Sequence, residues 1–131
     1  MSVNLTHFKL SEFDCKCGCG RNNMDEKFLL MLDRARAMAG VPFVIESGSR
    51  CPKRNAEVGS KSKNHIEGKA SDIRVSDGQA RGKILKGLYL AGFKRIGLIG
   101  KVLNVDGAWK AVPTGIHVDS MPEVESFFLE F

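Results

Sequence analysis

The sequence predicts a single α+β domain with a mainly antiparallel sheet of four to five short strands packed against two longer helices. Two segments carry apolar residues at helical spacing. Around them lie short apolar runs bounded by turns that contain glycine, proline or aspartate. At 131 residues the chain is long enough for one hydrophobic core but not for two. We therefore treat residues 1–131 as one domain, in which residues 1–22 form an N-terminal arm and a cysteine-containing loop.

The first long helix is expected to begin near residue 24. Asn22 or Asn23 offers an N-cap, and Asp25 with Glu26 suits the first turn of a helix. Gly40 and Pro42 end the segment. Its apolar face is expected to comprise Met24, Phe28, Leu29, Met31, Leu32, Ala35 and Met38.

The second long helix is expected from an Asp77 cap to about Ala91. Gly82 and Gly87 weaken it by up to about 1 kcal/mol each, unless close packing requires them. A shorter helix is expected over residues 52–58, opened by Pro52. The apolar face of the second helix is expected to contain Ala80, Ile84, Leu85, Leu88 and Tyr89.

The strands are expected in five short runs. These are residues 43–45, 70–75, 95–99, 102–105 and 116–119. Gly100-Lys101 is expected to turn a hairpin between the third and fourth runs, and Asp106-Gly107 is a further turn. At the two ends, apolar residues are expected to pack onto the core, namely Phe8, Leu10, Phe13, Phe127, Phe128, Leu129 and Phe131.

The chain is basic, since Lys and Arg exceed Asp and Glu by 20 − 15 = 5. A basic surface favours anionic partners. Apart from a cluster over residues 50–63 the charges are spread, and there is one Trp and one Tyr, so nucleic-acid binding lacks support. No stretch approaches the roughly 20 apolar residues of a membrane span, and the N-terminus does not resemble a signal peptide. We expect a monomer that is made in the cytoplasm and has no membrane partner.

Three of the four cysteines alternate in one loop, as Cys15, Cys17 and Cys19, and Cys51 stands alone. In a reducing compartment, free thiols or a bound metal are favoured over disulfides. In a protein released from the cell, the same residues can oxidise. The Cys-x-Cys-x-Cys spacing differs from the usual zinc knuckle, Cys-x2-Cys. A second, structural metal site and disulfides both stay open.

Two histidines and one aspartate are candidate zinc ligands. His65 lies seven residues before Asp72, with Gly68 allowing a bend between them, and His117 lies in a strand-like run far downstream. Two imidazoles and one carboxylate would leave a fourth position on zinc for water. Taken one at a time, each residue is more often a surface or core side chain. The prediction therefore requires that the fold bring all three together.

A water-activating zinc site also needs a proton acceptor. Side chains alternate along a strand, so Asp119 points to the same side as His117. Asp119 is then either the candidate general base or a partner that orients a ligand. Glu46 and Glu67 are weaker candidates for the base.

Residues 45–59, 65–73 and 116–119 closely resemble the zinc murein peptidases, which comprise D-Ala-D-Ala carboxypeptidases and L-alanyl-D-glutamate endopeptidases. These enzymes share a metal site with the hedgehog signalling domain, and phage endolysins are frequent members. The most specific element is His-x2-Gly-x-Ala-x-Asp, preceded by a Ser-Gly-x-Arg turn. The resemblance begins at residues 8–13 and 15–19, so it covers nearly the whole chain.

The resemblance implies a hedgehog/D,D-peptidase-like fold and a zinc peptidase that cleaves peptidoglycan stem peptides or cross-links. His65, Asp72 and His117 would bind Zn²⁺, and Arg50 would position a substrate carboxylate or carbonyl. The protein would act on the cell wall after release or as part of a phage particle. Where relatives carry a base, this chain has Thr114 and Gly115; where they carry serine, it has Lys63, with Ser62 shifted by one. A non-catalytic zinc-binding module of the same fold is the alternative.

Overall fold

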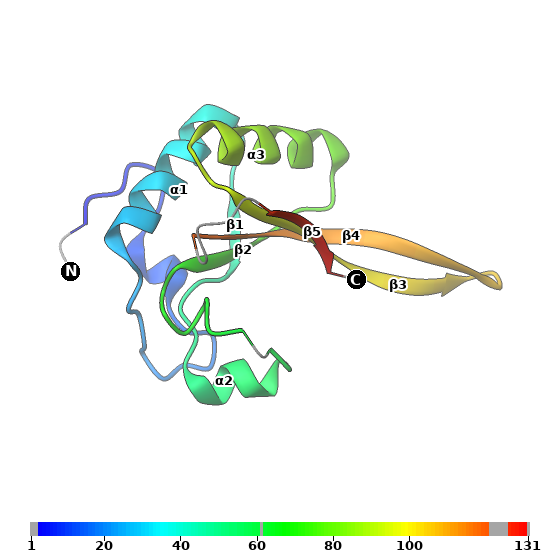
Figure 1. Ribbon diagram of the computed structural model, residues 1–131, viewed down its shortest axis with the longest axis horizontal. Helices are drawn as coiled ribbons and strands as arrows, with labels where there is room; N and C mark the ends of the chain where they lie inside the picture. The colour runs from blue at the N-terminus through cyan, green and yellow to red at the C-terminus, as the bar shows by residue number, and fades with distance from the viewer. Residues whose placement is uncertain (1–2, 61, 121–125, 131) are drawn as a thin grey trace.

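The structure is a computed structural model that describes residues 3–60, 62–120 and 126–130. One five-stranded sheet has the order β1-β2-β4-β3-β5, with helices α1 and α3 on one side and the short α2 on the other (Figure 1). The elements are η1 (Leu10–Phe13), α1 (Glu26–Ala39), β1 (Val44–Ser47), α2 (Pro52–Glu57), β2 (Ala70–Arg74), α3 (Gly78–Leu90), β3 (Arg95–Val105), β4 (Ala108–Asp119) and β5 (Ser126–Glu130).

Antiparallel pairing dominates the sheet and confirms the predicted α+β class. β1 pairs with β2, β2 with β4, and β4 with β3 in antiparallel fashion, whereas β5 joins β3 in parallel. Alternate residues of the central strands, such as Ile73 and Ile116, face α1 and α3 and are fully buried. The opposite set of side chains faces the side of the sheet that carries α2. The candidate functional residues lie on that side.

Helix α1 is capped by Asp25 rather than by Asn22 or Asn23. The Asp25 carboxylate accepts a hydrogen bond of 2.9 Å from the backbone N–H of Phe28. Asn22 and Asn23 instead donate to the backbone carbonyls of Leu10 and Ile66. Long-range contacts have therefore taken the two asparagines away from the cap. The end of the helix at Gly40, in the left-handed conformation, was correctly predicted.

Two residues assigned to the apolar helix faces are exposed. Met38 on α1 and Tyr89 on α3 are 48% and 71% exposed. Each residue lies at the edge of the apolar face expected for its helix, and the neighbouring helix covers only the centre of that face. Gly87, by contrast, is buried at the crossing of α3 with α1, where close packing requires a residue without a side chain.

The predicted hairpin at Gly100-Lys101 is wrong. β3 runs through these residues with only an irregularity between Ile99 and Gly100, and the chain reverses at Asp106-Gly107. Asp106 and Gly107 both adopt positive φ, at 52° and 83°, which suits the two-residue turn of a twisted hairpin. In Gly100-Lys101, by contrast, only the glycine readily adopts a positive φ. β4 consequently begins at Ala108, earlier than the predicted strand.

The apolar ends of the chain behave differently from each other. Phe8 and Phe13 are buried in the core, as predicted. Phe127 and Leu129 on β5 are 63% and 65% exposed, so the expected closure of the core by this segment is wrong for them. Alternation along β5 instead places Phe128 on the opposite face of the sheet, where its ring contacts that of His117. The expectation for Phe131 falls outside the described residues, as does the part of the basic cluster at Lys61. Among the described helices, none has the length and apolar character needed to cross a membrane.

Candidate metal centre

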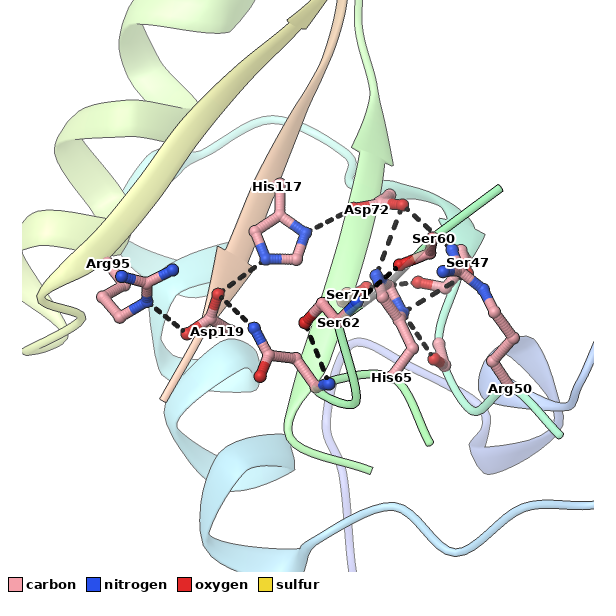
Figure 2. Close-up of polar contacts among 12 residues, drawn as sticks. Ser47, Arg50, Ser60, Ser62, His65, Ser71, Asp72, Arg95, His117 and Asp119 are labelled. Atoms are coloured by element: carbon pink, nitrogen blue, oxygen red, sulfur yellow. Dashed lines mark hydrogen bonds and ion pairs between the residues drawn. The ribbon is translucent and has the colours of Figure 1, made fainter. Parts of the chain in front are cut away.

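Strand register places Asp72 and His117 side by side. Asp72 on β2 is the direct cross-strand partner of His117 on β4, and their side chains share one face of the sheet (Figure 2). Asp72 Oδ1 lies 2.8 Å from His117 Nδ1. His65 approaches from the loop before β2, with its Nε2 at 3.4 Å from Asp72 Oδ2. One donor atom from each of the three residues lies within 4.8 Å of the other two.

His65 is held in the tautomer that a metal ligand needs. Its Nδ1 lies 2.9 Å from the carbonyl oxygen of Gly48, which can only accept a hydrogen bond. Nδ1 must therefore carry a proton, which leaves Nε2, the nitrogen that faces Asp72, as the atom available to a metal. The loop that carries His65 bends at Gly68, where φ is 72° and an added Cβ would collide with the backbone of Asn23. No larger side chain fits this bend.

The His117 ring lies between two carboxylates. Its Nδ1 faces Asp72, and its Nε2 lies 2.7 Å from Asp119 Oδ2. Burial alone would lower the pKa of His117, but the hydrogen bonds to Asp119 and Asp72 outweigh it and raise the pKa to about 9. With no metal bound, the protonated ring donates to both carboxylates. A metal at the site would replace the proton on Nδ1, while Asp119 would keep the proton on Nε2.

Asp72 is surrounded by positive charge. Burial would raise the pKa of Asp72, but hydrogen bonds from His117 and His65 lower it well below its usual range. Arg50 Nη2 lies 3.5 Å from Asp72 Oδ2, and the same guanidinium donates to Ser47 Oγ at 3.0 Å and to Asn55 Oδ1 at 3.1 Å. Asp72 is therefore ionised, and Arg50 is held in one position beside it. The Arg50 side chain is buried rather than part of a basic surface.

Asp119 lies on the far side of His117 from Asp72 (Figure 2). Besides the His117 contact, its carboxylate accepts hydrogen bonds from Arg95 Nε at 2.9 Å and from Asn64 Nδ2 at 3.1 Å. The residue is 1% exposed. A carboxylate that holds the outer nitrogen of a ligating histidine fixes the orientation of the ring. This arrangement favours the orienting role of Asp119 over the role of base.

A cavity of about 540 Å³ opens over the three candidate ligands. Arg50, Arg95 and Phe128 also line it, so the cavity combines two guanidinium groups with one aromatic face. Phe128 reaches it because Gly97, its partner on β3, has no side chain to stand in the way. The Phe128 ring centroid lies 5.8 Å from that of His117. Asp119 does not line this cavity.

The four cysteines form a second group of potential metal ligands, on the N-terminal side of α2. Their sulfur atoms all lie within 4.8 Å of one another. Burial alone would raise the pKa of the Cys15 thiol, but hydrogen bonds from the backbone amides of Cys17 and Cys51 outweigh it and lower the pKa to about 6. In this structure all four are free cysteines.

The sequence profile of the family described as Peptidase M15 matches residues 6–104, which is about three quarters of the chain. The chain belongs to the Peptidase M15 family. The predicted resemblance to zinc peptidases is therefore confirmed at the level of the family, and with it a metallopeptidase-type hydrolase. No curated protein sequence matches the chain.

The family match includes His65 and Asp72 but ends before β4. His117 is joined to the site by the register of β4 on β2. The three candidate ligands, Arg50 and Asp119 were predicted from the sequence to share one site, and the structure brings all five together. Asn55, Asn64 and Arg95, which hold the charged groups in place, were not predicted. Nothing local marks Asn64 and Arg95, because Asp119, the carboxylate that they hold, is distant along the chain.

Proposed function

We propose that this protein is a zinc-dependent peptidase that hydrolyses peptide bonds in bacterial peptidoglycan, in the stem peptides or their cross-links. The observation that carries the proposal is the convergence of His65, Asp72 and His117 in one cavity beside Arg50. Membership of the Peptidase M15 family supports the metal and the class of reaction. The net charge of +5 would favour approach to an anionic wall.

The donor set fits zinc. Two neutral imidazole nitrogens and one carboxylate oxygen are the ligand types of catalytic zinc sites, and both rings are oriented by acceptors on their outer nitrogens. When bound, zinc supplies Lewis-acid polarisation of a carbonyl group and lowers the pKa of a water molecule to about 7. The chain itself contributes the fixed geometry of the ligands and the charge around them.

Arg50 is the group proposed to orient the substrate. Its guanidinium lines the cavity and is held by Ser47, Asn55 and Asp72, so it needs little reorganisation when an anionic group binds. A planar guanidinium pairs with a carboxylate through two parallel hydrogen bonds. Stem peptides of peptidoglycan carry such carboxylates. Arg95 and Phe128 line the same cavity and would contact neighbouring parts of the peptide.

The proton acceptor is proposed to be Glu46 rather than Asp119. A smaller cavity of about 270 Å³ adjoins the first, and both are lined by Arg50 and Asp72. Glu46 on β1 lines this smaller cavity and is exposed. Asp119 has its carboxylate engaged by three donors on the other side of His117. A general base must reach the proton that it accepts.

Digestion of purified peptidoglycan tests the proposal. The zinc-loaded protein is expected to release new amino groups from the wall, and mass spectrometry of the fragments identifies the bond. Release of free D-alanine indicates a carboxypeptidase, whereas new termini within the peptides indicate an endopeptidase. His65→Ala should lose the zinc ion of this site and should release no product. His7→Ala, an exposed histidine on the N-terminal arm, is the matched control. Equal digestion by both variants would contradict the proposal.

A non-catalytic zinc-binding module is the second candidate. Thr114 and Gly115 occupy the positions where relatives carry a base, and neither can accept a proton at neutral pH. This alternative predicts that zinc binding requires His65 and His117. It also predicts that the zinc-loaded protein cleaves no murein fragment.

A further inference from the structure

The four cysteines converge from two distant parts of the chain. Cys15, Cys17 and Cys19 lie in the loop after η1, and Cys51 is the N-cap residue of α2. Gly18 and Gly20 adopt positive φ, at 85° and 83°, which lets the loop curl so that alternate residues face one point. This cluster lies outside the His65 site, and the proposed peptidase mechanism makes no use of it.

The sulfur–sulfur distances suit a common metal ion. Cys15 Sγ lies 3.5 Å from Cys17 Sγ, and Cys17 Sγ lies 3.6 Å from Cys51 Sγ. A tetrahedral zinc ion with Zn–S bonds of about 2.3 Å separates its sulfur ligands by about 3.8 Å. A disulfide would bring two sulfurs to about 2.05 Å. Four sulfurs within 4.8 Å of one another form a cage of the right size for one ion.

Backbone amides are directed at the sulfur atoms. The N–H of Cys51 donates to Cys15 Sγ at 3.4 Å, and the N–H of Arg54 donates to Cys51 Sγ at 3.4 Å. Such bonds favour the thiolate, the form of cysteine that binds metals. Lys16 lies between two of the cysteines in sequence, and Arg54 follows Cys51 by three residues. Both would offset the negative charge that four thiolates around a divalent ion carry.

We propose that Cys15, Cys17, Cys19 and Cys51 bind one structural zinc ion. Zinc is the divalent ion favoured by four thiolates in tetrahedral geometry, and such sites are closed to substrate. The ion would join the N-terminal loop to the start of α2 across 34 residues of sequence. This assignment is independent of the peptidase proposal, because the two sites share no ligand.

The proposed ion would also anchor the turn that carries Arg50. Cys51 directly follows Arg50, and on the other side Ser49 N–H donates to the carbonyl of Phe13 at 2.8 Å. The Ser49–Cys51 segment is thus fixed between the N-terminal arm and the cysteine cluster. Loss of the ion should loosen Arg50 and weaken substrate binding more than it slows turnover.

Zinc content per chain is the direct test, on protein purified under reducing conditions. We expect two zinc ions in the wild type, one in His65→Ala/His117→Ala and one in Cys17→Ser/Cys19→Ser. Cys17 and Cys19 are chosen because both are exposed, so the substitutions disturb no core packing. One ion in the wild type, lost from the histidine variant and retained in the cysteine variant, would overturn the cysteine site alone. The reverse pattern would overturn the peptidase site alone.

Cobalt replacement identifies the ligands spectroscopically. Thiolate-bound Co²⁺ gives intense charge-transfer absorption in the near ultraviolet, which should persist in the histidine variant and vanish in the cysteine variant. Should Cys17→Ser/Cys19→Ser not fold, the test is a titration of thiols in the unfolded wild-type chain, on protein purified without added reductant. Four reactive thiols after chelation, with fewer reacting in the folded zinc-loaded protein, support the site. Two or no thiols in the unfolded chain would show disulfides and overturn it.

Discussion

At the scale of the residue, the charges around His117 determine what the site can do. Asp72 faces the inner nitrogen of the ring and Asp119 the outer nitrogen. Arg95 and Asn64 in turn hold Asp119. The two carboxylates therefore differ in position, since only Asp72 lines the cavity over the candidate ligands.

Asp119→Asn and Glu46→Gln separate the orienting group from the base. Asp119→Asn should weaken zinc binding about 10- to 100-fold, because the amide holds the outer nitrogen of His117 less firmly. Competition with a chelator of known affinity measures this loss. Glu46→Gln should leave zinc affinity unchanged and lower kcat by about 100-fold or more. Unchanged zinc affinity in Asp119→Asn, with kcat abolished, would instead identify Asp119 as the base.

At the scale of the element, α1 and α3 cross at a glycine. A Cβ on Gly87 would lie 2.5 Å from the carbonyl oxygen of Ala35 and 2.9 Å from Ala39 Cβ. The helices can approach this closely only because Gly87 has no side chain. Gly82, five residues earlier on α3, is exposed, and a Cβ added there would have no neighbouring atom within 4 Å.

Gly87→Ala and Gly82→Ala should change stability in opposite directions. Gly87→Ala should lower the free energy of unfolding by about 1–3 kcal/mol, because it forces the helices apart. Gly82→Ala should raise it by about 0.5–1 kcal/mol, because alanine loses less backbone entropy in a helix. Urea denaturation followed by circular dichroism measures both. Stabilisation by Gly87→Ala would contradict the packing described for this crossing.

The position of β5 depends on another glycine. A Cβ on Gly97 would lie 2.2 Å from Phe128 Cε2. The Phe128 ring occupies the space that Gly97 leaves, next to His117, and the Arg95 guanidinium lies 5.3 Å from the ring centroid. Phe128 can therefore form one wall of the candidate substrate cavity only because Gly97 has no side chain.

Gly97→Ala should destabilise the protein only while Phe128 is present. In the wild-type background we expect a loss of about 1 kcal/mol or more, from displacement of the ring. In a Phe128→Ala background the same change should be neutral or stabilising, because alanine is the better strand residue. A double-mutant cycle measured by thermal unfolding gives the coupling. Additive effects would show that the two residues do not interact.

At the scale of the whole molecule, the sheet extends well beyond the core. The ends of β3 and β4 form a two-stranded arm that projects from the body (Figure 1). Its apolar side chains, Trp109 among them, are exposed. The core and both clusters of potential ligands lie at the other end of these strands. The outer part of the arm should therefore contribute little to folding.

Removing two residue pairs from the arm should leave the fold intact. Deletion of Asn104, Val105, Ala108 and Trp109 makes Leu103 and Lys110, already cross-strand partners, the residues that flank the Asp106-Gly107 turn. An even number of pairs preserves the alternation of hydrogen-bonded positions. We expect the free energy of unfolding to change by less than about 1 kcal/mol.

Deletion of the single pair Val105 and Ala108 is the control for this shortening. The pair next to the turn is then Asn104 and Trp109, which is of the other hydrogen-bonding type. The single-pair deletion should therefore lower the free energy of unfolding more than the larger deletion does. Both are measured by chemical denaturation. A large loss in the two-pair deletion would show that the arm supports the core.

Several features of this protein follow from local sequence alone. Gly40 ends α1, Asp77 caps α3, and Asp106-Gly107 turns the hairpin, because each of these depends on the conformation of one or two residues. The composite motif around His65 and Asp72 also indicated the family correctly. The false turn at Gly100-Lys101 arose because a glycine beside a polar residue fits an irregular strand as well as a reversal.

Contacts between distant segments could be identified only from the tertiary structure. Register on β2 puts His117 opposite Asp72, and register on β3 puts Arg95 opposite Asp119. Tertiary packing also brings Cys51 to Cys17, and it places the Asn22 side chain on the N-terminal arm instead of at the helix cap. Residue spacing reports which side chains share a strand or a turn, but it carries no information about which strands pair or in what register. The types of the candidate ligands could therefore be predicted from the chain, whereas their geometry and the roles proposed for the two aspartates depend on how the strands align.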